Sequence, residues 1–123
     1  APSYLDGRGR PAVPGDLAGH DLLGFAPVER LVATLVAFGL PVTRRNFRHV
    51  TDNGLVLAEM LQRGLGVAVT PAEFARRMAG IEPVLPDWPG IPVPLWLIAH
   101  REVQTSRRIR VVFDFLAEAL NRG

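Results

Sequence analysis

The sequence predicts an α/β fold in which short buried strands alternate with helices. Three segments, at 22–25, 47–50 and 67–69, are each about the length of a strand, and the first and third of them are apolar runs. The segments between them carry apolar residues at helical spacing. Because the third run is apolar on both faces, a parallel sheet covered by helices is expected, with right-handed crossovers.

The first half of the chain contains the first two of these strands and one helix. Residues 1–19 are rich in glycine and proline, and Pro14-Gly15-Asp16 predicts a single helical turn. After the strand at 22–25, Pro27 is expected as the first residue of a helix, where its missing N–H would be unpaired anyway. Gly39 ends that helix. Its apolar stripe comprises Val28, Leu31, Val32, Leu35, Val36 and Phe38.

A second helix and the third strand follow the strand at 47–50. Asn53 is expected to cap a helix that carries Val56, Leu57, Met60 and Leu61, and Gly64 to take the left-handed conformation after its last turn. The strand at 67–69 follows. Thr70 and Glu73 then have the spacing of a capping box, with Pro71 as the first residue of a helix that runs to about Met78.

The C-terminal part reads as a connector, a strand and a long helix. The proline-rich segment 83–94 is the connector, 93–99 is the most strand-like run in the chain, and 105–121 is amphipathic at helical spacing. The apolar stripe of this helix is wide, so it is expected to be covered. The helix would either fold back onto the rest of the chain or exchange with a second copy. Its residues are Ile109, Val112, Phe113, Leu116 and Leu120, widened by Val111 and Phe115.

Composition indicates an ordinary globular protein and argues against several functional classes. Of 123 residues, 48% are apolar and 21% charged, and the absence of cysteine excludes disulfides and thiolate chemistry. All 14 basic residues are arginines in separate places without interleaved aromatics, so direct nucleic-acid binding by this chain is disfavoured. No apolar run approaches a membrane span and residues 1–6 form no secretory signal, so a cytoplasmic location is expected.

Gly64-Leu65-Gly66 could suggest a phosphate-binding loop, but its position argues against one. In phosphate loops the glycines follow a strand and open a helix, so that backbone N–H groups face the anion. Here the order is helix, glycines, strand, and no Lys-Ser/Thr pair follows. These glycines are therefore expected to be structural.

Enzymatic chemistry finds little support in the sequence. His20, His49 and His100 lack the spacing of a zinc site, and no Gly-x-Ser-x-Gly motif is present. The acids Asp52, Glu82 and Asp87 are scattered as solvated acids usually are. We expect no enzyme, no metal and no cofactor. A small histidine enzyme remains an alternative, which a histidine beside a carboxylate inside a pocket would support.

Thr51-Asp52-Asn53 is the most suggestive position for a ligand. It lies where a strand is expected to end and a helix to begin, which is where ligands gather in open α/β folds. The helix N–H groups and the Thr51 hydroxyl could hold a carboxylate, whereas Asp52 would oppose an anion and favour an amine or hydroxyl. The alternative is that Asn53 only caps the helix.

Three blocks together resemble the effector-binding domain of LysR-type transcriptional regulators. "YLDGRGRPAVPGDLAGHDLLGF" (4–25) is similar to the opening of its second lobe, and "TDNGLVLAEMLQRGLGVAVTP" (51–71) to that lobe's helix–Gly-Leu-Gly–strand block. "VLPDWPGIPVPLWLIAHREVQTSRRIRVVFDFLAEAL" (84–120) looks like its return strand and C-terminal helix. The segment 26–50 matches least well.

The resemblance implies a Rossmann-like lobe of a type 2 periplasmic-binding-protein fold. Residues 3–93 would form the second lobe, and 94–123 the return strand and helix of a first lobe that is otherwise missing. It also implies a small-molecule effector, with a carboxylate as one candidate. The regulator would be a homodimer or tetramer that binds DNA only through an N-terminal winged helix-turn-helix absent from this chain.

Carried over residue by residue, the resemblance implies one effector-binding set. It comprises Ser3, Phe25, Ala26, Thr51, Asp52 and Asn53. The expected function is therefore effector sensing and oligomerisation within a LysR-type regulator. The alternative is a stand-alone α/β lobe that binds a solute or a partner protein and has no role at DNA.

Overall fold

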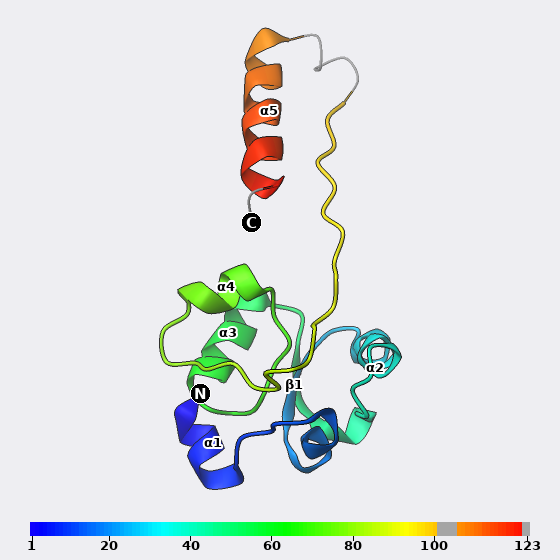
Figure 1. The fold of residues 1–123 in the computed structure, drawn as a ribbon, viewed down its shortest axis with the longest axis vertical. Helices are drawn as coiled ribbons and strands as arrows, with labels where there is room; N and C mark the ends of the chain where they lie inside the picture. Colours follow the sequence, from blue (N-terminus) through cyan, green and yellow to red (C-terminus); the bar gives the residue numbers. More distant parts are fainter. Residues whose placement is uncertain (101–105, 122–123) are drawn as a thin grey trace. The chain divides into compact units, whose positions relative to one another are not determined.

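The computed structural model describes residues 1–100 and 106–121, which divide into two compact units, Ala1–Ile91 and Pro92–Gly123 (Figure 1). Each unit is described by itself. The elements of the first unit are α1 (Pro2–Arg8), the 3-10 helix η1 (Pro14–Gly19), β1 (Leu22–Phe25), α2 (Val28–Ala37), the 3-10 helix η2 (Arg44–Asn46), β2 (Phe47–Thr51), α3 (Gly54–Gln62) and α4 (Ala72–Arg77). The second unit contains α5 (Arg107–Asn121).

The sheet of the first unit is parallel, as predicted, and β1 is its inner strand. β1 pairs with β2 so that Phe25 lies opposite Thr51. The third predicted strand is reduced to one bridge, at which the Leu23 N–H donates to Val67 O at 2.8 Å and the Val67 N–H to Asp21 O at 3.0 Å. In the described chain the pairing extends no further, because the backbone leaves the sheet toward Pro71 and α4. The prediction of a strand over 67–69 was therefore too long.

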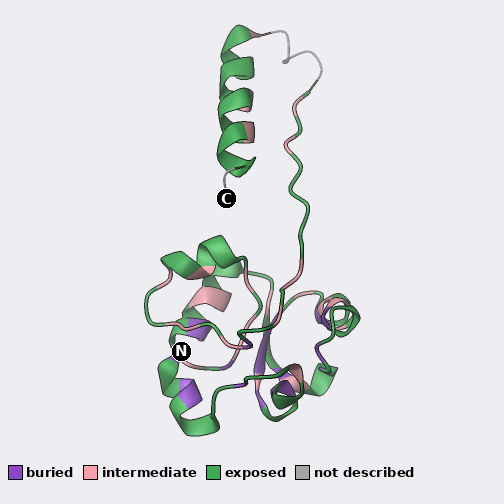
Figure 2. Ribbon diagram, viewed as in Figure 1, coloured by how far each residue is buried: buried purple, intermediate pink, exposed green. Residues whose placement is uncertain are grey.

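The hydrophobic core lies around β1. Both α2 and α3 pack against this strand, and they lie to either side of it in Figure 1. Leu23, Leu35 and Leu40 are the largest fully buried side chains. Figure 2 shows that the buried residues belong to the first unit. The core cluster comprises Leu17, Leu22, Val28, Leu35, Leu40, Val42, Phe47 and Leu85.

The helix ends confirm some predictions and correct others. Asn53 caps α3 as predicted, and Gly39 and Gly64 take left-handed φ angles of 84° and 72°. Pro27 is the extended N-cap residue of α2 and not its first residue. The prediction of a capping box at Thr70 and Glu73 was wrong, because α4 begins one residue later than expected.

At α4 the N-cap is Pro71, which has no side-chain oxygen to offer the first turn. Thr70 therefore lies one position before the cap, and too early in the chain to act as one. Glu73 instead forms an ion pair with Arg76 on the same helix.

In the second unit no strand forms over the described residues 92–100, which corrects the prediction of a strand at 93–99. A strand requires a neighbouring strand to complete its hydrogen bonds, and the described residues 92–100 form no such ladder. Its large apolar side chains are exposed, Trp96 to 80%. α5 forms as predicted from Arg107, with no buried residue, while Thr105 lies outside the described residues.

No helix among the described residues is long and apolar enough to span a membrane.

A pH-dependent contribution to stability is expected from Asp16 in η1. Its carboxylate accepts the backbone N–H groups of Val13 at 3.1 Å and of Ala12 at 2.9 Å. These two hydrogen bonds lower the pKa of Asp16 in the folded chain. The stabilisation is therefore present above the unfolded pKa near ~4 and is lost as the pH falls through the lower folded pKa.

Urea unfolding at pH 6 and pH 3 measures this contribution. From pH 6 to pH 3, the urea midpoint of Asp16→Asn should fall by less than the urea midpoint of the wild-type chain, because the variant lacks the titrating carboxylate. An identical pH dependence in the two proteins would show that this cap does not stabilise the fold.

Candidate functional site

Five of the six predicted effector-binding residues lie together at the carboxyl edge of the sheet. Because β1 and β2 are parallel and Phe25 lies opposite Thr51, both strands end at the same place. The Ala26 N–H donates to Thr51 O at 2.9 Å, which extends the pairing past the end of β1. Asp52 and Asn53 follow directly and lead into α3. We call this group, formed by 25–26 and 51–53, the strand-end site.

The polar groups of the strand-end site are partly engaged by the start of α3. The Asn53 Oδ1 accepts the N–H groups of Leu55 at 2.9 Å and Val56 at 3.3 Å. The Thr51 Oγ1 accepts the Asn53 N–H at 3.1 Å. The capping role therefore holds for Asn53, so an anion could not also take those two helix N–H groups. The Thr51 hydroxyl hydrogen and the Asn53 side-chain N–H groups remain as donors.

Asp52 gives the strand-end site a negative charge. It is exposed, and its carboxylate has no ion-pair partner within residues 1–100 and 106–121. This carboxylate would repel an anion bound close to it and attract an amine or hydroxyl. The strand-end site can therefore serve a ligand that offers a hydrogen-bond acceptor to the Thr51 and Asn53 donors and an amine or hydroxyl to Asp52.

The structure does not bring Ser3 to this site. Ser3 lies in α1, close to Gly64, which is the second residue after α3, because a Cβ added to Gly64 would lie 2.5 Å from the Ser3 Oγ. Asn53 precedes the first turn of the same helix. The length of α3, roughly 13 Å at 1.5 Å per residue, therefore separates Ser3 from the other five.

An apolar cavity of about 300 Å³ adjoins the strand-end site. Phe25 and Gly54 line it from the edge of the sheet, and Phe74 and Met78 line it from α4 and its end. Thr70 and Pro71, which precede α4, also line this cavity and were not among the predicted site residues. They follow the third strand run as Asp52 follows β2, so the same strand-end rule could have found them.

His20 and His49, two of the three histidines of the rival enzyme hypothesis, do not belong to the strand-end site. His20 precedes β1, at the opposite end of that strand from Phe25, and is buried beside the ring of Tyr4 with 5.7 Å between ring centroids. His49 is exposed in the middle of β2. Over the described ranges, no group of three or more His, Asp or Glu side chains could hold a metal ion.

One family comparison decides what kind of domain this is. The family profile described as "LysR substrate binding domain" matches residues 1–121, nearly the whole chain. The chain belongs to the LysR substrate-binding domain family. Comparison with curated proteins yields no match, and none of the solved structures matches either.

Membership of the LysR family agrees with the mixed helix and strand structure. Its substrate-binding domains have an α/β fold like that of periplasmic binding proteins, and they are parts of regulators rather than enzymes. The family therefore points to effector sensing in a LysR-type regulator.

Proposed function

We propose that this chain is the effector-sensing part of a LysR-type transcriptional regulator and that the strand-end site contacts the effector. One observation carries the proposal: Phe25, Thr51 and Asn53 converge at the carboxyl edge of a parallel sheet, next to an apolar cavity, in a chain that belongs to this family. Ligands of open α/β folds occupy this position. Binding would shift the population of regulator conformations, as effectors of two-state proteins do.

The residues at the strand-end site suit a small carboxylate with an apolar body. The Thr51 hydroxyl and the Asn53 amide can donate to a carboxylate, while Phe25 and Phe74 line the adjoining cavity. Asp52 would then take a hydroxyl or amine of the same ligand. A cavity of about 300 Å³ lies at the lower end of the range for small-molecule pockets.

The parent regulator, on this proposal, is a cytoplasmic homodimer or tetramer that binds DNA through an N-terminal winged helix-turn-helix. The exposed apolar face of α5, which includes Val112 and Phe115, supports self-association. The division into a second lobe at 3–93 and first-lobe elements at 94–123 belongs to the same proposal. The rival is a stand-alone lobe that binds a solute or partner, and a start codon adjacent to the Ala1 codon would favour that rival.

Thr51→Val tests the effector site. Aromatic and aliphatic monocarboxylates are first screened against the chain by thermal shift, and ¹⁵N NMR then selects those that perturb the amides of 25–26 and 51–54. For such a ligand, Thr51→Val should weaken binding at least tenfold, since it removes a hydroxyl donor but keeps the shape of the side chain. Isothermal titration measures both affinities.

Thr34→Val is the matched control. The Thr34 hydroxyl donates to Arg30 O within α2, away from the strand-end site, so this variant should bind like the wild type. Equal affinity of Thr51→Val and wild type, or ligand shifts confined to other residues, would refute the strand-end site as the effector site.

A further inference from the structure

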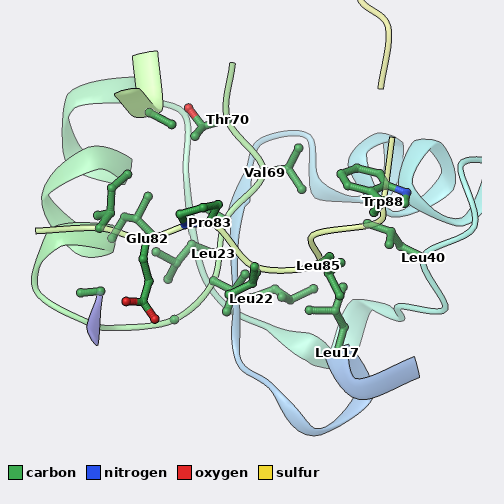
Figure 3. A pocket seen from close by; sticks show the side chains of 18 of the residues that line it. Leu17, Leu22, Leu23, Leu40, Val69, Thr70, Glu82, Pro83, Leu85 and Trp88 are labelled. Carbon is green, nitrogen blue, oxygen red and sulfur yellow. The ribbon is translucent and has the colours of Figure 1, made fainter. Parts of the chain in front are cut away.

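A second and larger apolar cavity lies inside the first unit, between the sheet and the segment 81–88. Its volume is about 530 Å³, and Figure 3 shows the leucines and Trp88 that surround it. Protein interiors are packed densely and contain few voids larger than a water molecule. This volume instead falls within the range of small-molecule pockets. Leu17, Leu22, Leu23, Leu40, Leu85 and Trp88 are among its lining residues.

The segment 81–88 is anchored at fixed points where it borders this cavity. The Leu85 N–H donates to Pro11 O at 3.1 Å, and the Trp88 indole Nε1 donates to Phe38 O at 3.0 Å. Leu85 is buried and has a φ of 56°, a conformation that side chains other than glycine rarely adopt. The surrounding contacts therefore hold this segment in a strained position, bordering the space and not filling it.

The charged side chains that line the cavity already have partners. The Glu82 Oε1 accepts a hydrogen bond from the Arg10 Nε at 2.6 Å, and Arg76 is paired with Glu73. Ala1 also lines the cavity, and burial lowers the pKa of its α-amino group, which disfavours the charged form. The rest of the lining is apolar apart from Thr70 and backbone atoms. A charged ligand would have to leave water and lie beside side-chain charges that are already paired, which is unfavourable. Water is also a poor occupant of a cavity lined by carbon.

We propose that this cavity binds a neutral, apolar small molecule of two or three rings. The site is different from the strand-end site, although the two cavities share the lining residues Leu61, Ala68, Val69, Thr70 and Met78. The proposal does not depend on which effector the strand-end site takes. Its occupant would fill space that the core leaves open and would support the segment 81–88.

The neutral fluorophore N-phenyl-1-naphthylamine is a suitable probe because its emission rises in apolar surroundings. Titration of the full chain should give saturable binding with one probe per chain. The carboxylate 1-naphthoate should bind to the same place at least tenfold more weakly. A non-saturable signal, or equal affinity for the two molecules, would overturn the proposal of a neutral apolar site.

Two alanine-to-phenylalanine variants locate the probe. Ala75 in α4 lines only the larger cavity of the two, and Ala58 in α3 lines only the cavity beside the strand-end site. Both alanines are half-buried helical residues, so the substitutions are matched. Ala75→Phe fills the larger cavity and should weaken probe binding at least tenfold, whereas Ala58→Phe should leave it within twofold. The reverse pattern, or no change in either variant, would refute the assignment.

Methyl NMR of the wild-type chain gives the same answer if a variant fails to fold. The probe should shift the methyl signals of Leu22, Leu23 and Leu85 and leave those of Val111 and Val112 in α5 unchanged. Shifts confined to α5 would show that the probe adheres to the exposed helix face. That result would overturn the cavity as a binding site.

Discussion

Gly66→Ala is expected to be among the most destabilising single substitutions in this chain. A Cβ at this position would lie 2.5 Å from Asp21 O, which is a backbone atom and cannot rotate away. The same oxygen accepts the Val67 N–H at 3.0 Å. The added carbon would therefore force 66–67 away from β1 and weaken the bridge. We expect a loss of roughly 2–4 kcal/mol of unfolding free energy from the clash and the strained hydrogen bonds.

Urea unfolding followed by circular dichroism measures this loss, and Gly7→Ala is the control. Gly7 lies inside α1, where a Cβ would meet nothing within 4 Å, so alanine should be neutral or stabilise by up to ~1 kcal/mol. Of the total stability of a small domain, about 5–15 kcal/mol, Gly66→Ala would remove a large part. If both variants had wild-type stability, 66–67 would not be held against β1 as described.

Gly66 also shows which parts of the sequence analysis succeeded. The order helix, glycines, strand excluded a phosphate loop, and the structure shows a glycine required by close backbone approach. Strands 22–25 and 47–50 were predicted nearly residue for residue, because each is a short segment bounded by polar and turn residues. The run at 67–69 is as apolar as 22–25, but backbone pairing, which composition does not encode, stops after Val67.

Whether an element depends on neighbouring residues or on distant contacts explains the other agreements and differences between prediction and structure. Asn53 was correctly predicted as a cap because its partners lie two and three residues away. The segment 93–99 has high strand propensity, yet propensity alone cannot supply a hydrogen-bonding neighbour. The helix α1 was not predicted, since glycines and prolines surround it. Tertiary contacts select it, because Tyr4 and Leu5 are buried and the Tyr4 hydroxyl accepts the Asp21 N–H at 2.8 Å.

The candidate site was predictable to the extent that it follows strand ends. Thr51 and Asn53 are two residues apart in sequence, and the parallel register brings Phe25 next to Thr51. Ser3 came from the family resemblance alone, and nothing in the local sequence shows that α3 separates it from the others. Both cavities depend on how segments far apart in the chain border one space, which no spacing rule describes.

Leu35→Ala is the second substitution with a large expected effect. Leu35 in α2 is 2% exposed and packs in the core around β1, so removal of its side chain should cost about 2–5 kcal/mol. Val36, the next residue, is 52% exposed, and Val36→Ala should change stability by no more than about 0.5 kcal/mol. Urea unfolding of both variants, with unchanged m-values, isolates the contribution of burial.

The size of the Leu35→Ala effect also reports on the larger cavity. Leu35 lines that cavity, so the alanine variant would enlarge a space that is already present. If the cavity persists in solution, its walls are held apart and cannot relax, and the loss should lie in the range above. A loss below about 1 kcal/mol would mean that the surrounding side chains collapse into the space, because the cost of such substitutions falls as the site closes. That outcome would count against an open cavity even if Gly66→Ala behaved as expected.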